Sequence, residues 1–206
     1  DFVTAAVQRY SGDVKHWGMW NEPNLGQFYR GTRAQYTNEI LVPGSDAVHA
    51  ACADCQVLGP ELAHLRGAEW DADEGICAFD ECLFNGWNYS LQQILADADS
   101  SIDIITHHKY ADPYDEWWDE AISGEWFLDL QVVNGIQDVT DAYGQGQPVW
   151  ITEFGWESEP FGAYSNAYTS DQVTGMYAGM GTATWPELEK LFWYDLQADP
   201  GGYSWG

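Results

Sequence analysis

Two glutamates stand out in the sequence because each follows a short apolar run and has tryptophan close by. Glu22 lies in Trp20–Asn24 (WNEPN), and Glu153 lies in Ile151–Trp156 (ITEFGW). The apolar runs predict buried strands, which would place both carboxyl groups at strand ends. Cleavage of a glycosidic bond requires two such carboxyl groups, one held protonated and the other held ionised.

The surroundings of the two glutamates predict different roles. Glu22 lies between Trp20 and Pro23, an apolar setting that favours the protonated acid. Glu153 is the better candidate for the nucleophile, because Tyr110 could donate a hydrogen bond that holds the carboxylate ionised. The alternative is that each glutamate only solvates a loop.

The composition limits the possible partners of the chain. Its 206 residues, 45% of them hydrophobic, are enough for one sizeable domain with a core. Acidic residues outnumber basic ones by 33 to 7, for a net charge of −26. Such a surface repels nucleic acid and anionic membranes, so we expect neither as a partner. Both an acidic secreted protein and a protein adapted to high salt fit this charge.

Tryptophan and cysteine each suggest a further property. The 12 tryptophans exceed what one small core needs, and flat aromatic faces suit a carbohydrate cleft. The four cysteines form two local pairs, Cys52 with Cys55 and Cys77 with Cys82. We expect two short disulfides, which would indicate an oxidising, extracytoplasmic setting and a secreted protein; a zinc site and buried thiols are the alternatives.

The elements that must position the two glutamates follow one another in a regular order. Apolar spacing predicts an opening helix over residues 2–10, and helices then alternate with strands. Thr32 is expected to cap a helix that Pro43 interrupts, and Ser170 to cap the last helix. The strands are expected near residues 15–20, 56–59, 102–106, 148–152 and 191–194, with long loops at 64–89 and 112–125. This alternation predicts a parallel sheet with right-handed crossovers.

The ordered motifs resemble those of clan A glycoside hydrolases, the retaining (β/α)8-barrel enzymes. In that clan an Asn-Glu-Pro motif ends strand four and supplies the acid/base, and a glutamate ending strand seven is the nucleophile. Asn21–Pro23 and Glu153 fit these positions, His108–Tyr110 resembles the His-x-Tyr of strand six, and Trp193 resembles the tryptophan of strand eight. The resemblance implies an α/β fold, an incomplete TIM barrel made of strands four to eight with their outer helices.

By this mapping residues 1–206 form a single partial barrel domain that begins in helix three. Strands one to three and the last helix have no counterpart, and no signal peptide or membrane-spanning run is seen. Five strands cannot close an eight-stranded barrel. We therefore expect either that an upstream segment belongs to the chain, or that two copies pair as a homodimer that covers the open side.

Further residues are candidates for binding the substrate. Asn21 would bond the sugar 2-hydroxyl or cap a loop, and Tyr110 could instead be a core tyrosine. For His107 and His108 we prefer a hydrogen-bonded position at the rim to a role as metal ligands, and expect no metal and no cofactor. The substrate-binding candidates are Asn21, Glu61, His108, Tyr110, Trp156 and Trp193, with Trp117 and Trp118 as weaker ones.

The function predicted by these features is the retaining hydrolysis of β-glycosidic bonds in an oligo- or polysaccharide. A barrel remnant that binds carbohydrate without turnover is the alternative from another class, and one part of a split barrel is a third. The intact pair Glu22 and Glu153, with Asn21 and Tyr110 beside them, favours the enzyme.

Overall fold

A computed structural model describes residues 2–63, 87–110, 133–155, 165–182 and 186–194 of the chain. Several predicted features therefore lie outside the described residues: most of both long loops, the Cys77–Cys82 pair, and the tryptophans at positions 117, 118 and 156. Within the described residues, no helix combines the length and apolar character needed to cross a membrane.

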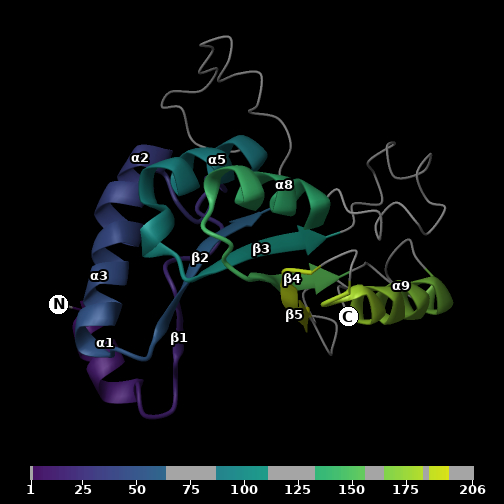
Figure 1. The fold of residues 1–206 in the computed structure, drawn as a ribbon, viewed down its shortest axis with the longest axis horizontal. Helices are drawn as coiled ribbons and strands as arrows, with labels where there is room; N and C mark the ends of the chain where they lie inside the picture. Colours follow the sequence, from purple (N-terminus) through teal and green to yellow (C-terminus); the bar gives the residue numbers. More distant parts are fainter. Residues whose placement is uncertain (1, 64–86, 111–132, 156–164, 183–185, 195–206) are drawn as a thin grey trace, which may run out of the picture.

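The described part of the chain is an incomplete (β/α)8 barrel. Five parallel strands pair in chain order, each with the next. They are β1 (His16–Gly18), β2 (Gln56–Ala63), β3 (Ile104–Tyr110), β4 (Val149–Gly155) and β5 (Leu188–Trp193). Figure 1 shows these strands as a twisted sheet rather than a closed ring.

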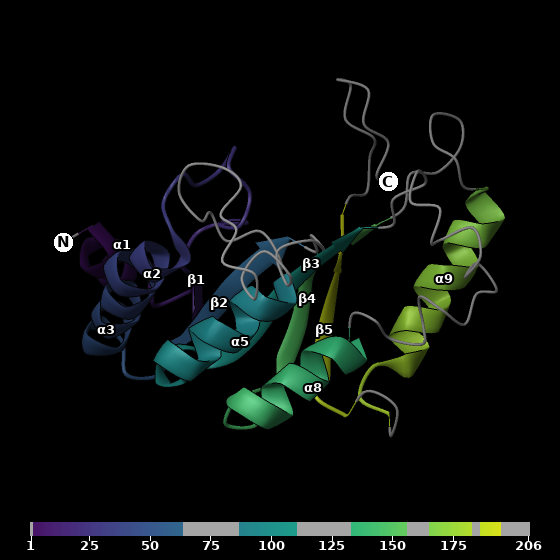
Figure 2. The same cartoon turned by 90° about the horizontal axis from the view of Figure 1, so that it is seen from above.

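The helices lie along one face of the sheet, as Figures 1 and 2 show. In chain order they are α1 (Phe2–Tyr10), α2 (Arg33–Gln35), the π-helical turn η1 (Tyr36–Leu41), α3 (Val42–Ala51), α5 (Trp87–Ala98), the 3-10 turn η2 (Asp99–Ser101), α8 (Val133–Tyr143) and α9 (Asn166–Gly179). One hydrophobic core fills the layer between this face and the helices. Strands β2 to β5 contribute buried residues to it, and Met19 contributes from just after β1. The alternation of strands and helices expected from the sequence is confirmed.

The other face of the sheet curls around Trp150 of β4. The Trp150 ring lies 4.8 Å from the ring of His16 on β1 and 6.0 Å from that of Phe192 on β5. The Lys190 ammonium lies 3.7 Å from the Trp150 centroid, a cation–π contact. Because β1 and β4 are separated by two strands in the sheet order, a contact between them requires the sheet to bend into a barrel wall.

The structure corrects the expected break at Pro43. Thr32 caps α2 as expected, in a capping box with Gln35. The chain then continues through Pro43 without a break, because the π-helical turn shifts the hydrogen-bond register: the Val42 N–H donates to the Thr37 carbonyl, five residues back. The wider turn admits a proline, which has no N–H to donate and would crowd an α-helical turn.

The strands and the last helix also differ from the expected bounds. The strand expected at residues 56–59 runs on to Ala63 and so includes Glu61. Ser170 does not cap the last helix: the Ser165 side chain accepts the Tyr168 N–H and starts α9 earlier. Apolar patterning shows neither extension clearly, because Pro60 and Glu61 interrupt the apolar run of the strand and both serines are small and polar.

Tyr36 joins the ends of β1 and β2 to the helix layer. Its side chain is fully buried, and its hydroxyl donates to the Met19 carbonyl at 3.0 Å, with the Pro60 carbonyl at 3.4 Å. These carbonyls lie close to Glu22 and Glu61 in the chain, so this buried tyrosine supports the backbone from which both carboxylates project.

Replacing Tyr36 with Phe should lower the free energy of unfolding by about 1–2 kcal/mol, because buried carbonyls lose their donor. Urea unfolding followed by tryptophan fluorescence measures this loss. Tyr143→Phe is the matched control, since Tyr143 is 43% exposed on α8. Equal effects of the two substitutions would contradict the supporting role of Tyr36.

Candidate active site

The segment that carries Glu22 leaves β1 in an unusual backbone conformation. Trp20 has φ 98° and Glu22 has φ 43°, and both angles lie in the region that residues other than glycine rarely adopt. The Glu22 N–H donates to the Glu61 carbonyl at 3.0 Å, which attaches the segment to β2. Strained residues of this kind cluster at functional sites, where the surrounding structure must hold them.

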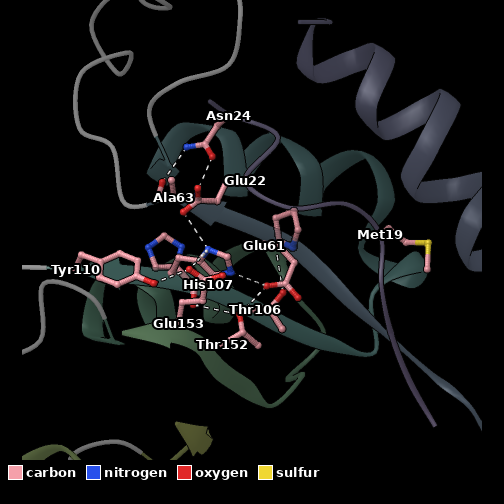
Figure 3. A network of polar contacts seen from close by, with 12 residues as sticks. Met19, Glu22, Asn24, Glu61, Ala63, Thr106, His107, Tyr110, Thr152 and Glu153 are labelled. Atoms are coloured by element: carbon pink, nitrogen blue, oxygen red, sulfur yellow. Dashed lines mark hydrogen bonds and ion pairs between the residues drawn. The ribbon is translucent and has the colours of Figure 1, made fainter. Parts of the chain in front are cut away.

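Asn24 fixes the same segment through a second attachment. Its amide group donates to the Ala63 carbonyl at 2.8 Å and accepts the Ala63 N–H at 2.9 Å, as Figure 3 shows. Asn24 is buried. The sequence interpretation quoted this residue as part of the Trp20–Asn24 motif but gave it no role; an asparagine after proline can as easily cap a turn.

Glu153 lies near the carboxyl end of β4 and receives the hydrogen bond predicted for it. The Tyr110 hydroxyl donates to Glu153 Oε2 at 2.6 Å. Burial raises the pKa of Tyr110 far above its usual value, and the bond to Glu153 raises it further. Tyr110 therefore stays protonated and remains a donor to this carboxylate at every pH of interest.

Glu22 and Glu153 approach one another across His108. His108 Nδ1 lies 3.0 Å from Glu22 Oε1 and 3.5 Å from Glu153 Oε2. The ligand atoms of these three side chains all lie within 4.8 Å of one another, so an oxygen of one glutamate comes this close to an oxygen of the other. Retaining glycosidases hold their two carboxyl groups roughly 5–5.5 Å apart. The glutamate side chains are 12% and 29% exposed, so both can be reached from solvent.

Glu61 enters the site from β2. It has a left-handed backbone (φ 56°), and its N–H donates to the Thr106 hydroxyl at 3.2 Å. Its Oε2 accepts the Thr152 hydroxyl at 2.6 Å and lies 3.1 Å from His108 Nε2. On its other side, a Cβ placed on Gly18 would come within 3.2 Å of Glu61 Oε1. Figure 3 shows Glu22, Glu61, Thr152 and Glu153 directed toward one centre, while Met19 points away from it.

His108 is the charged centre of the site and does not lie at its rim. Its side chain is only 3% exposed, because β3 is a central strand with partners on both sides. Burial alone would lower the pKa of His108. Hydrogen bonds to Glu22 and Glu61, together with the charges of Glu153 and Glu61, outweigh burial and raise this pKa to about 9. The ring is therefore protonated at neutral pH and donates from both nitrogens.

His107, the next residue, has the opposite character. Burial lowers the pKa of His107 well below its usual value, and the charges of His108 and Lys109 lower it further. Its ring packs against Trp87 of α5 at 5.1 Å. His107 is thus a neutral residue of the helix-facing layer, whereas its neighbour faces the carboxylates.

Three other predicted site features have clear positions. Asn21 is exposed beside Glu22. Trp193 is partly buried, and its ring packs edge to face on Phe154 at 5.3 Å. Cys52 and Cys55 form the predicted disulfide. The sugar-binding roles of Asn21 and Trp193 stay predictions.

Besides Asn24, two residues of the site were missed by the sequence interpretation. Thr152, directly before Glu153, contacts Glu61; Tyr194, directly after β5, has its ring 6.1 Å from that of Tyr110 and is 45% exposed. Each is adjacent in sequence to a residue that was singled out. Bulges in the pairing of β4 change which residues face inward, and sequence spacing does not show them.

Glu22, His108 and Glu153 are also close enough together to resemble a cation site. A protonated imidazole has no lone pair to offer a metal, and both nitrogens of His108 already face carboxylates. The geometry therefore suits proton transfer and charge stabilisation better than metal binding.

The fold is similar to that of several glycoside hydrolases of known structure. A xyloglucanase of family GH44 from Paenibacillus polymyxa aligns with a TM-score of 0.61 and 17% identity, over 96% of this chain and 46% of its own. A GH39 β-xylosidase from Caulobacter crescentus gives a TM-score of 0.56 and 19% identity, over 94% of this chain and 37% of its own.

A GH128 curdlan-specific exo-β-1,3-glucanase from Blastomyces gilchristii gives a TM-score of 0.55 and 15% identity, over 96% of this chain and 70% of its own. This chain thus spans about half the length of the xyloglucanase. No protein-family model and no curated protein matches the sequence. At these identities the comparisons establish a shared fold, the barrel of glycoside hydrolases.

The raised pKa of His108 predicts a pH dependence of stability. Between pH 6.5, the usual value, and about pH 9, the folded protein keeps a proton on His108 that the unfolded chain has released. The stabilisation from the protonated ring is therefore fully present below pH 6.5 and is lost as the pH rises to about 9. The loss is on the order of 3 kcal/mol.

Urea unfolding at several pH values in this window tests the prediction. The fall in stability should be absent from a His108→Gln variant and present in His49→Gln, since His49 is a partly exposed histidine of α3. A wild-type slope equal to that of His108→Gln would show that His108 does not carry the extra proton.

Proposed function

We propose that this chain is the catalytic part of a retaining β-glycosidase, with Glu22 as acid/base and Glu153 as nucleophile. The observation that carries the proposal is the approach of their carboxylate oxygens to within 4.8 Å at the carboxyl edge of the sheet. In (β/α)8 barrels this edge is where active sites form.

The first step would form a glycosyl ester. Tyr110 and His108 both contact Oε2 of Glu153, so Oε1 is the oxygen that would attack the anomeric carbon. As the new bond forms, the bond from that carbon to the leaving oxygen breaks, and Glu22 gives its proton to the leaving oxygen. The Glu22 carboxylate that results lies 3.0 Å from His108 Nδ1, which stabilises its charge.

The second step would release the sugar. Water attacks the same carbon and the ester bond to Glu153 breaks, while Glu22 accepts the proton of the water. Glu22 ends protonated and Glu153 ionised, which restores the starting state. Two displacements at one carbon retain the anomeric configuration.

The setting of the enzyme is part of the same proposal. A β-linked glucan or xylan is the substrate class we favour, since the neighbours in structure are a xyloglucanase, a β-xylosidase and a β-1,3-glucanase. We place the chain in clan A, with its strands as numbers four to eight of one domain. The Cys52–Cys55 disulfide favours secretion.

Carbohydrate binding without turnover is the second candidate. Within the residues described, β1 and β5 each pair on one side only, and the chain spans 46% of the xyloglucanase. Three further strands would supply part of a sugar site, from an upstream segment or from a second copy. Hydrolysis by the protein separates this candidate from the first.

Hydrolysis of unsubstituted phenyl β-glucosides and β-xylosides, with Glu153→Ala and Glu22→Ala variants, tests the proposal. Each substitution should lower kcat/KM by at least about 10²-fold, because a covalent nucleophile or a general acid is lost. Glu39→Gln, an exposed change on η1, should leave the rate unchanged.

Added azide distinguishes the two roles. In Glu22→Ala it should intercept the glycosyl ester and give a β-glycosyl azide. In Glu153→Ala it should attack directly and give the α-azide. The opposite pattern would reverse the assignment, and tryptophan fluorescence that responds to oligosaccharide without any hydrolysis would favour binding alone.

A further inference from the structure

Glu61 is a third buried carboxylate in the site, and the two-step reaction above gives it no task. Its side chain is 10% exposed, and its Oε2 faces two donors, the Thr152 hydroxyl at 2.6 Å and His108 Nε2 at 3.1 Å. Burying a carboxylate costs free energy unless it is paired and hydrogen-bonded. The position of Glu61 therefore calls for a reason beyond packing.

The contacts of Glu61 determine how the ring of His108 is oriented. The protonated ring donates from both nitrogens, so Nε2 donates to Glu61 Oε2 at 3.1 Å. The ring is then oriented with Nδ1 toward Glu22 Oε1, 3.0 Å away. A flipped or rotated ring would lose one of these two bonds, so Glu61 sets the direction of the ring.

The backbone holds Glu61 in turn. Its N–H bonds to the Thr106 hydroxyl, its carbonyl accepts the Glu22 N–H, and its own left-handed φ of 56° aims the side chain inward. Gly18 leaves the room that Oε1 occupies. The backbone contacts thus fix the position of Glu61, and Glu61 in turn orients the His108 ring.

We propose that Glu61 is a positioning residue for the acid/base step, which keeps His108 protonated with its Nδ1–H directed at Glu22. The proposal rests on the function proposed above. Negative charge develops on Glu22 as its proton passes to the leaving oxygen, and a fixed Nδ1–H stabilises that charge where it forms. Thr152 assists by holding Glu61 Oε2 in place.

Nuclear magnetic resonance of the imidazole nitrogens tests the positioning without any substrate. The signals of His108 are those absent from the His108→Gln variant. In Glu61→Gln, an isosteric change that removes the charge but keeps an acceptor, the titration midpoint of His108 should fall by about one pH unit or more. Thr152→Val should shift it in the same direction, and Glu39→Gln should not shift it.

Leaving-group dependence tests the catalytic consequence. A dinitrophenyl β-glycoside needs little protonation of its leaving oxygen, whereas an unsubstituted phenyl β-glycoside needs much. In Glu61→Gln, kcat/KM should fall roughly 10- to 100-fold for the phenyl substrate and less than about threefold for the dinitrophenyl substrate. A merely structural role of Glu61 would lower both values alike.

The outcomes separate this proposal from the function on which it rests. An unchanged His108 titration in Glu61→Gln, or equal losses on the two substrates, overturns the positioning role while hydrolysis by the wild type still supports the function. If the wild type hydrolyses no glycoside, the function fails, and with it the catalytic task of Glu61, even where the titration shifts.

Discussion

Three carboxylates meet a single imidazole at the carboxyl edge of this sheet, and the rest of the site depends on that balance of charge. His108 is almost fully buried, and a buried cation is stable only where hydrogen-bond acceptors surround it. Glu22, Glu61 and Glu153 supply them from three separate segments. The ring thus lets three carboxyl groups gather within 3.5 Å of one side chain.

Backbone conformation and backbone hydrogen bonds, more than side-chain contacts, place the glutamates around His108. Glu22 and Glu61 both adopt left-handed conformations and are joined by a hydrogen bond between their main chains. Asn24 attaches the same loop to Ala63. Since β1 has only three residues, these attachments make the segment that carries Glu22 in effect an extension of β2. The positions of these glutamates are therefore determined mainly by the hydrogen bonds of their backbone.

Much of this arrangement could be predicted from the sequence, since the relevant signals are local. Apolar runs and caps identified the strands, the opening helix and the Thr32 cap, and the motifs around Glu22, Glu153 and Tyr110 indicated which side chains would meet. The centre of the site could not be predicted in the same way. His108 reads as a polar strand end, and only the sheet order shows that β3 is central and its end buried. The π-helical turn before Pro43 shifts the helical hydrogen-bond register by one residue, and the bulges in β4 shift the strand pairing by one residue. The spacing of apolar residues in the sequence does not show shifts this small.

Gly18 carries a consequence for how this site can change over evolutionary time. A methyl group at position 18 would lie 3.2 Å from Glu61 Oε1, so the absence of a side chain at this position leaves room for the glutamate on β2. A larger residue at position 18 would be accommodated most readily together with a shorter acid at position 61. The two positions are 43 residues apart in the chain (61 − 18), yet we expect related barrels that share this geometry to substitute them as a pair.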